Sequence, residues 1–134
     1  MFRKLKLESL DIYRDGGSLS VTYRDNHRIL NVLTFPVQLR LNSDYTKPLY
    51  SEPKLEKHFE KKTVSPVTGL SRYESETHEL NLSWKEARSI LLKLASQVSA
   101  IDSQYKWIFD EMCLIANSEG LAGSKDLAKL TDIN

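Results

Sequence analysis

Apolar residues recur every three or four positions from Trp84 to Ile115, with no glycine or proline inside this stretch. Such spacing is typical of an amphipathic α-helix. Ser83 and Glu86 stand at the positions of an N-terminal capping box, so we expect the helix to begin there. One straight helix over the stretch would be roughly 50 Å long, whereas a compact domain of this size has a diameter of about 36 Å. The helix must therefore break, or project and find a partner.

We place the break between Ser96 and Ser103, because Ser99, Asp102 and Ser103 are poor helix formers and good caps. One strongly bent helix and two packed helices both satisfy the pattern. The apolar stripe is wider than a coiled-coil seam, which favours packing on a sheet over a coiled-coil dimer.

The preceding part of the chain alternates apolar and polar residues, as half-buried strands do. The phase changes between Leu7 and Leu10, which predicts a bulge near Glu8 and Ser9. The segment 29–35 is apolar on both faces, as in a central strand that is covered on both sides, and a fourth strand is expected over 37–41. The predicted fold is α+β: a four- to five-stranded antiparallel β-meander followed by a long, broken helical segment packed on the sheet.

We expect one domain over residues 1–134. Residues 1–42 form the meander, and residues 43–78 form a long loop with a short helix near 54–62. Residues 79–82 add a fifth strand, residues 83–117 are helical, and residues 118–134 form a tail with a short helix near 124–130.

The composition and charge of the chain limit the classes of function that it could have. The 19 basic and 18 acidic residues nearly cancel, whereas strong polyanion binders carry a basic surplus. Cys113 is the single cysteine and lies in an apolar run, so we interpret it as a small core residue. The N-terminus has no apolar signal region, and no stretch approaches the ~20 apolar residues of a membrane span. We therefore expect a soluble cytoplasmic protein without membrane contact.

The sequence contains no recognisable catalytic constellation. His27, His58 and His78 lack the spacing of metal ligands, and no phosphate-binding or nucleophile-elbow motif occurs. We expect no enzymatic activity, no metal and no cofactor.

The hairpin from Ile12 to Val21, with its Asp15-Gly16-Gly17-Ser18 turn, resembles small bacterial toxin-immunity proteins of the contact-dependent inhibition type. The order of elements, an early β-meander followed by helices, also resembles that of these proteins. The resemblance implies a non-catalytic inhibitor that covers the active site of a toxin. It transfers no individual functional residue.

The long segment 43–76 carries the aromatic and charged anchors that a protein interface needs. Nuclease toxins are usually basic, so an inhibitor would present glutamates. The predicted partner-binding set is Tyr45, Tyr50, Glu52, Glu56, Phe59, Glu60, Tyr73, Glu74 and Glu76.

The alternative function is single-strand nucleic-acid binding, because a meander followed by a long helix also resembles Whirly-like binders. Its contact face would carry Lys4, Lys6, Arg24 and Arg40. An adaptor with an unspecified protein partner is a third interpretation. A monomer is favoured, and a dimer would form through the helical region.

Overall fold

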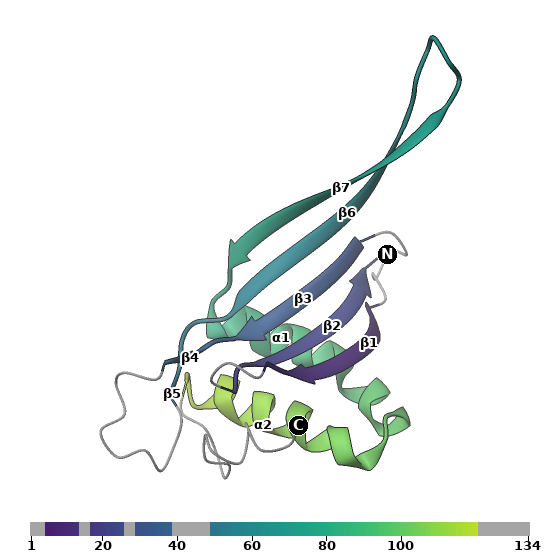
Figure 1. The fold of residues 1–134 in the computed structure, drawn as a ribbon. Helices are drawn as coiled ribbons and strands as arrows, with labels where there is room; N and C mark the ends of the chain where they lie inside the picture. Colours follow the sequence, from purple (N-terminus) through teal and green to yellow (C-terminus); the bar gives the residue numbers. More distant parts are fainter. Residues whose placement is uncertain (1–4, 14–16, 26–28, 39–48, 121–134) are drawn as a thin grey trace.

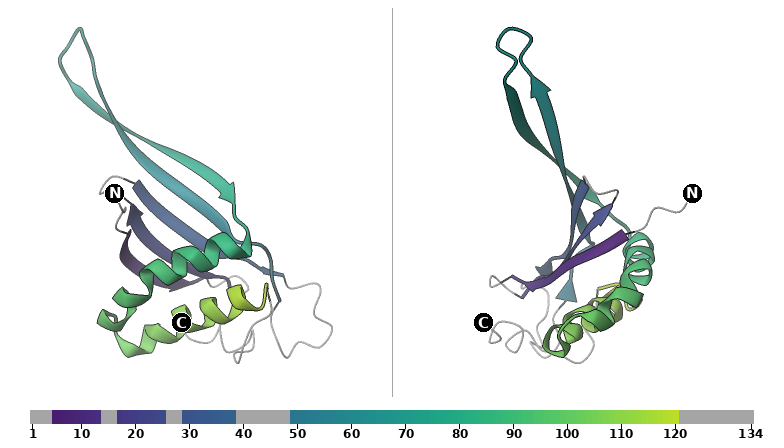
Figure 2. Two further views of the ribbon diagram at one scale, coloured as in Figure 1. Left: turned by 180° about the vertical axis from the view of Figure 1, so that it is seen from behind. Right: turned by 90° about the vertical axis from the view of Figure 1, so that its right-hand side faces the viewer.

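A computed structural model describes residues 5–13, 17–25, 29–38 and 49–120. Its main sheet has five antiparallel strands in the order β1-β2-β3-β6-β7, and its helices lie on one face of that sheet (Figures 1 and 2). The predicted α+β class is confirmed. The strands of this sheet are β1 (Leu5–Ile12), β2 (Leu19–Asp25), β3 (Ile29–Phe35), β6 (Lys54–Val64) and β7 (Ser71–Asn81).

The first three strands follow the predicted meander. The register of β1 against β2 shifts between Leu7 and Ser9, where the change of phase predicts a bulge. The hairpin closes with the Tyr13 N–H donating to the Ser18 carbonyl at 2.8 Å, and Gly17 has a φ of +74°. A positive φ suits glycine, which has no Cβ to clash. Residues 14–16 of the turn lie outside the described residues.

The segment 43–78 is wrongly predicted as a loop with a short helix, because β6 occupies 54–64 and β7 begins at Ser71. Leu55 and Phe59 are four residues apart, a spacing that fits one face of a strand as well as one face of a helix. The second edge of β3 decides between them, since β3 pairs with β6 from Thr34↔Lys54 to Ile29↔Phe59. Accordingly, the fifth strand is β7 over 71–81 rather than 79–82.

The strand expected over 37–41 does not join the main sheet. β4 (Val37–Gln38) pairs with β5 (Leu49–Tyr50) in a separate two-stranded ladder. Pro36 precedes β4 and removes a backbone donor, so the chain leaves the sheet after Phe35. Residues 39–41 and the tail helix expected near 124–130 lie outside the described residues. β3 is the central strand, as predicted, but the described helices cover only one of its faces (Figure 2).

The helical region breaks where predicted. α1 (Trp84–Leu94) is followed by the 3₁₀ helix η1 (Ala95–Ala100) and then by α2 (Ser103–Asn117). The predicted capping box is present: the Ser83 Oγ accepts the Glu86 N–H at 3.1 Å, and the Glu86 Oε1 accepts the Ser83 N–H at 3.2 Å. Asp102 occupies the N-cap position of α2. Of the two arrangements left open by the sequence, two packed helices is the one observed.

The core lies between the sheet and the helices. Leu19, Val21, Leu33 and Phe35 meet Leu91, Leu94, Met112 and Ile115, and all eight side chains are fully buried. The Phe35 and Trp84 rings meet edge to face, with their centroids 5.6 Å apart. Tyr23 shares the phase of Leu19 and Val21 along β2 and is buried with them, at 4% exposed. β6 joins this core through Leu55, which is 4% exposed, and β7 pairs with β6 at the edge of the sheet.

Candidate functional site

The hairpin of β6 and β7 projects beyond the rest of the sheet as an arm (Figures 1 and 2). β3 pairs with β6 only as far as Phe59, whereas β6 pairs with β7 through Val64↔Ser71. Residues 60–64 and 71–75 therefore have only each other as strand partners among the described residues. At about 3.4 Å per residue, these five-residue segments extend ~17 Å past β3.

The turn that closes the arm is ordered by its own hydrogen bonds. The Ser65 N–H donates to the Leu70 carbonyl at 3.0 Å, and the Gly69 N–H donates to the Ser65 carbonyl at 2.9 Å. The Ser65 Oγ accepts the N–H groups of Val67 and Thr68 at 3.4 Å each. Gly69 has a φ of +70°, which other residue types rarely adopt. These bonds therefore hold the backbone of the turn in a defined conformation without help from the core.

Four large apolar side chains are exposed at and beside this turn. We call this group the apolar tip: Val64 is 57% exposed, Val67 91%, Leu70 71% and Tyr73 71%. Single exposed apolar residues are ordinary, but a cluster on a projecting element is characteristic of an interaction site. Sequence reasoning missed Val64, Val67 and Leu70. The available signal was two aliphatic residues placed among the turn formers Pro66 and Gly69.

The predicted glutamates do not gather into one acidic patch. In the β6–β7 register, Glu56 and Glu60 share a face with Tyr73, whereas Glu74 and Glu76 share the opposite face with Phe59. Glu52 precedes β6 and is exposed. Several of these carboxylates have basic neighbours. Glu56 lies 3.4 Å from the His58 ring, Glu74 lies 3.7 Å from the Arg72 guanidinium, and Glu76 lies 3.2 Å from the His78 ring.

The predicted aromatic anchors are also separated. Tyr50 is 3% exposed, so it is unavailable to a partner in this structure, and its hydroxyl has no hydrogen-bond partner in the described chain. Burial, and then the charge of Glu111, raises the pKa of Tyr50. Phe59 is half-buried and packs edge to face against His78, with their centroids 5.2 Å apart. Tyr45 lies outside the described residues. Only Tyr73 belongs to the apolar tip.

The alternative nucleic-acid face is described only in part, because Lys4 and Arg40 lie outside the described residues. Lys6 and Arg24 are paired in the β1–β2 register, so they lie on the same face of the sheet, as the predicted contact face requires. However, the Arg24 Nε donates to the Glu8 Oε1 at 3.0 Å. The ion pair offsets the positive charge that a phosphate would need, so this part of the face offers a weak anchor for a polyanion.

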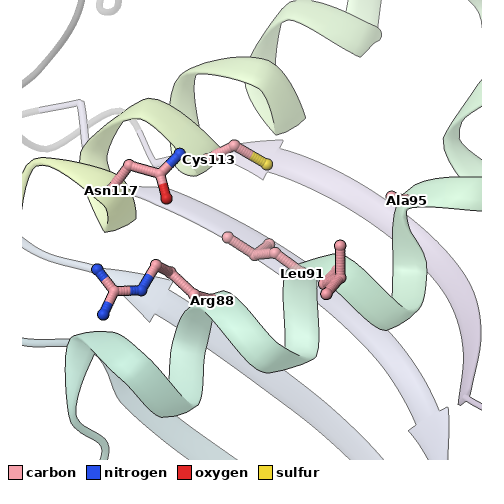
Figure 3. A pocket seen from close by; sticks show the side chains of 6 residues that line it. Arg88, Leu91, Ala95, Cys113 and Asn117 are labelled. Atoms are coloured by element: carbon pink, nitrogen blue, oxygen red, sulfur yellow. The ribbon is translucent and has the colours of Figure 1, made fainter.

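A groove of about 290 Å³ lies between α1 and α2, and Figure 3 shows its lining. Arg88 lies beside Asn117 at one end, and its Nη1 donates to the Ala116 carbonyl at 3.2 Å. Burial, and then the charge of Asp110, raises the pKa of the half-buried Cys113 thiol to about 11. Cys113 is therefore protonated near neutral pH and is a poor nucleophile. The groove contains no base that would activate it.

The part of the chain that the structure describes contains neither a candidate metal site nor a helix that could span a membrane. Residues 5–13, 17–25, 29–38 and 49–120 contain no group of three or more His, Cys, Asp or Glu side chains that could hold a metal ion. Within the same ranges, no helix has the length and apolar character needed to cross a membrane.

The fold and the arm thus define an α+β protein from which a β-hairpin with an apolar tip projects. No family model, curated protein or solved structure matches this chain.

Proposed function

We propose that this protein is a non-catalytic, protein-binding inhibitor that contacts its partner through the β6–β7 arm. The observation that carries the proposal is the apolar tip, which stands on an ordered turn well away from the core. A pre-organised turn loses little conformational entropy when it binds, so more of its contact energy appears as affinity.

The energetic weight of the tip follows from its exposure. Fully burying a Val or Leu side chain is worth about 1.5–3 kcal/mol. Val67 and Leu70 are almost fully available for such burial. Together they would contribute about 3–6 kcal/mol, which corresponds to at least a hundredfold in Kd.

The partner we propose is a bacterial toxin domain, and the site of action is the cytoplasm of the producing cell. This step rests on the resemblance of the 12–21 hairpin to immunity proteins. The arm suits the role, because an element that extends ~17 Å past β3 can enter a cleft and cover an active site. Segment 54–81 carries five Lys or Arg and five Glu residues, so shape and apolar contact would determine recognition more than net charge.

The glutamates remain candidate contacts at the base and sides of the arm. Replacing Glu52, Glu56, Glu60, Glu74 and Glu76 singly with Ala should leave the fold intact and weaken partner binding. Unchanged affinity in every case would remove the glutamates from the proposed interface and leave the apolar tip as the anchor.

The decisive experiment compares a tip variant with an exposure-matched control. Val67→Ser/Leu70→Ser removes the tip, whereas Leu92→Ser removes an equally exposed leucine, 78% exposed, from α1. Each protein is used as bait in its native host, and the captured partner is tested for toxicity with and without added inhibitor. We expect the wild type and Leu92→Ser to bind and neutralise the partner, and the tip variant to do neither.

If the tip variant binds and neutralises as well as the wild type, the arm is not the binding element. A gel shift with a labelled oligonucleotide over a salt series distinguishes nucleic-acid binding from protein-binding inhibition, because phosphate contacts weaken steeply with salt. A salt-dependent shift that is lost in Arg24→Ala would support that function in place of inhibition.

A further inference from the structure

The two edge strands of the main sheet, β1 and β7, differ in how their open edges are protected. At the β1 edge, the Gln97 side chain from η1 pairs with the strand backbone. Its Oε1 accepts the Leu7 N–H at 2.8 Å, and its Nε2 donates to the Leu5 carbonyl at 2.5 Å. The register shift between Leu7 and Ser9 also interrupts this edge. A bulge and a covering group are two recognised ways in which proteins prevent strand addition.

The described part of the β7 edge has neither a bulge nor a covering side chain. Its eleven residues pair with β6 without a register shift, and all of them are exposed. β6 is the single strand neighbour of β7 in the described chain. The strand Ser71–Asn81 contains no proline or lysine, the residues that most often blunt an edge. An open edge of this length without a bulge is a template for another antiparallel strand.

Charge restricts how two copies of β7 could pair about a two-fold axis. Registers centred on Glu74, Glu76 or Glu79 set a glutamate opposite its own copy. The register centred on Ser75 sets Glu74 opposite Glu76, twice. Like charges directly opposite one another destabilise antiparallel pairs. These four registers are therefore disfavoured.

Among the registers that align at least five residues, three avoid opposed carboxylates. The one centred on Tyr73 aligns only residues 71–75, and the one centred on His78 aligns residues 75–81 and opposes two imidazoles. The one centred on Thr77 aligns the longest span, residues 73–81. It sets Glu76 opposite His78 twice, so that an imidazole N–H can donate to a carboxylate across the interface.

We propose that two copies of this chain pair antiparallel through β7, centred on Thr77, joining the two sheets into one. The turn residues 65–70 lie beyond the paired span, so Val67 and Leu70 stay free for another partner. This inference does not depend on the proposed inhibitory function, because it rests on the backbone edge of β7; of the apolar tip, only Tyr73 lies within the paired span, at its end.

Cysteine cross-linking tests the register directly, in a Cys113→Ala background that removes the native thiol. In Thr77→Cys the two introduced residues face each other at a Cα–Cα distance of about 5 Å, within the range of a disulfide. In Ser75→Cys, on the same face of β7, they are offset by four residues, or ~14 Å. We expect mild oxidation to give a covalent dimer with Thr77→Cys and none with Ser75→Cys.

Sedimentation velocity over a concentration series tests the association of the unmodified chain, for which we expect a reversible dimer. His78→Glu opposes two pairs of glutamates and should weaken the dimer by about tenfold. The matched control His58→Glu places the same charge on β6, one strand from the interface, and should have no effect on association. A chain that stays monomeric at every concentration, or that cross-links as well through residue 75 as through residue 77, overturns the proposal.

Discussion

Gly120 closes the end of α2 in a way that only glycine permits. Its φ is +115°. Its N–H donates to the Ile115 carbonyl at 3.0 Å, and its carbonyl accepts the Tyr50 N–H at 2.7 Å. The residue therefore ties the helical layer to the small β4–β5 ladder, and we expect Gly120→Ala to loosen both.

The size of the effect follows from the space around Gly120. An added Cβ would lie 2.7 Å from the Tyr50 carbonyl oxygen and 3.4 Å from the Trp84 Cζ2. The oxygen is backbone and cannot swing aside as a flexible side chain would. The unusual φ costs about 1–3 kcal/mol for a residue with a Cβ, and forced overpacking adds about 1–3 kcal/mol. The sum of about 2–6 kcal/mol is a large share of the 5–15 kcal/mol typical of a folded domain.

Urea denaturation followed by circular dichroism measures this loss as a fall in the midpoint at constant slope. Gly69→Ala is the matched control, because Gly69 also has a positive φ but has open space around its Cβ position. Its cost should be limited to the backbone term of about 1–2 kcal/mol. If the two substitutions destabilise equally, steric contact with Tyr50 does not determine the requirement for glycine at position 120.

Three further predictions concern the scaffold. Ser83→Ala removes the capping box of α1 and should lower the unfolding free energy by about 1 kcal/mol in urea titrations. Leu94→Ala opens a cavity in the core and should cost about 2–5 kcal/mol, whereas Leu92→Ala on the exposed face of α1 should stay within about 0.5 kcal/mol in the same assay. Burial, and then the charge of Asp25, raises the pKa of Tyr23 from 10.0 to about 12. Stability should therefore hold up to about pH 10 and fall between pH 10 and 12, with a shallower fall in Tyr23→Phe.

Local patterns in the sequence were enough to predict the elements whose geometry depends on near neighbours. The capping box at Ser83, the helix break before Ser103 and the bulge after Leu7 all follow from residue types within a few positions. Each depends on backbone hydrogen bonding or side-chain periodicity that a short segment expresses by itself. The α+β class follows from the switch of period along the chain.

The arm could not be predicted in this way. Leu55 and Phe59 fit a strand or a helix equally well, and the charged residues between them are neutral to both. Only the pairing of β6 with β3 and β7 selects the strand. The sequence also did not indicate which of the tyrosines are buried. Tyr50 is 3% exposed, whereas Tyr73 is 71% exposed.

The sequence alone therefore determined a sheet, a broken helical layer and the absence of a local catalytic motif, because these depend on short-range spacing. Tertiary structure decided that the residues between them extend as a β-arm with an apolar tip and an open edge. The physical reason is that a strand, unlike a helix, satisfies its backbone hydrogen bonds with residues distant in the chain.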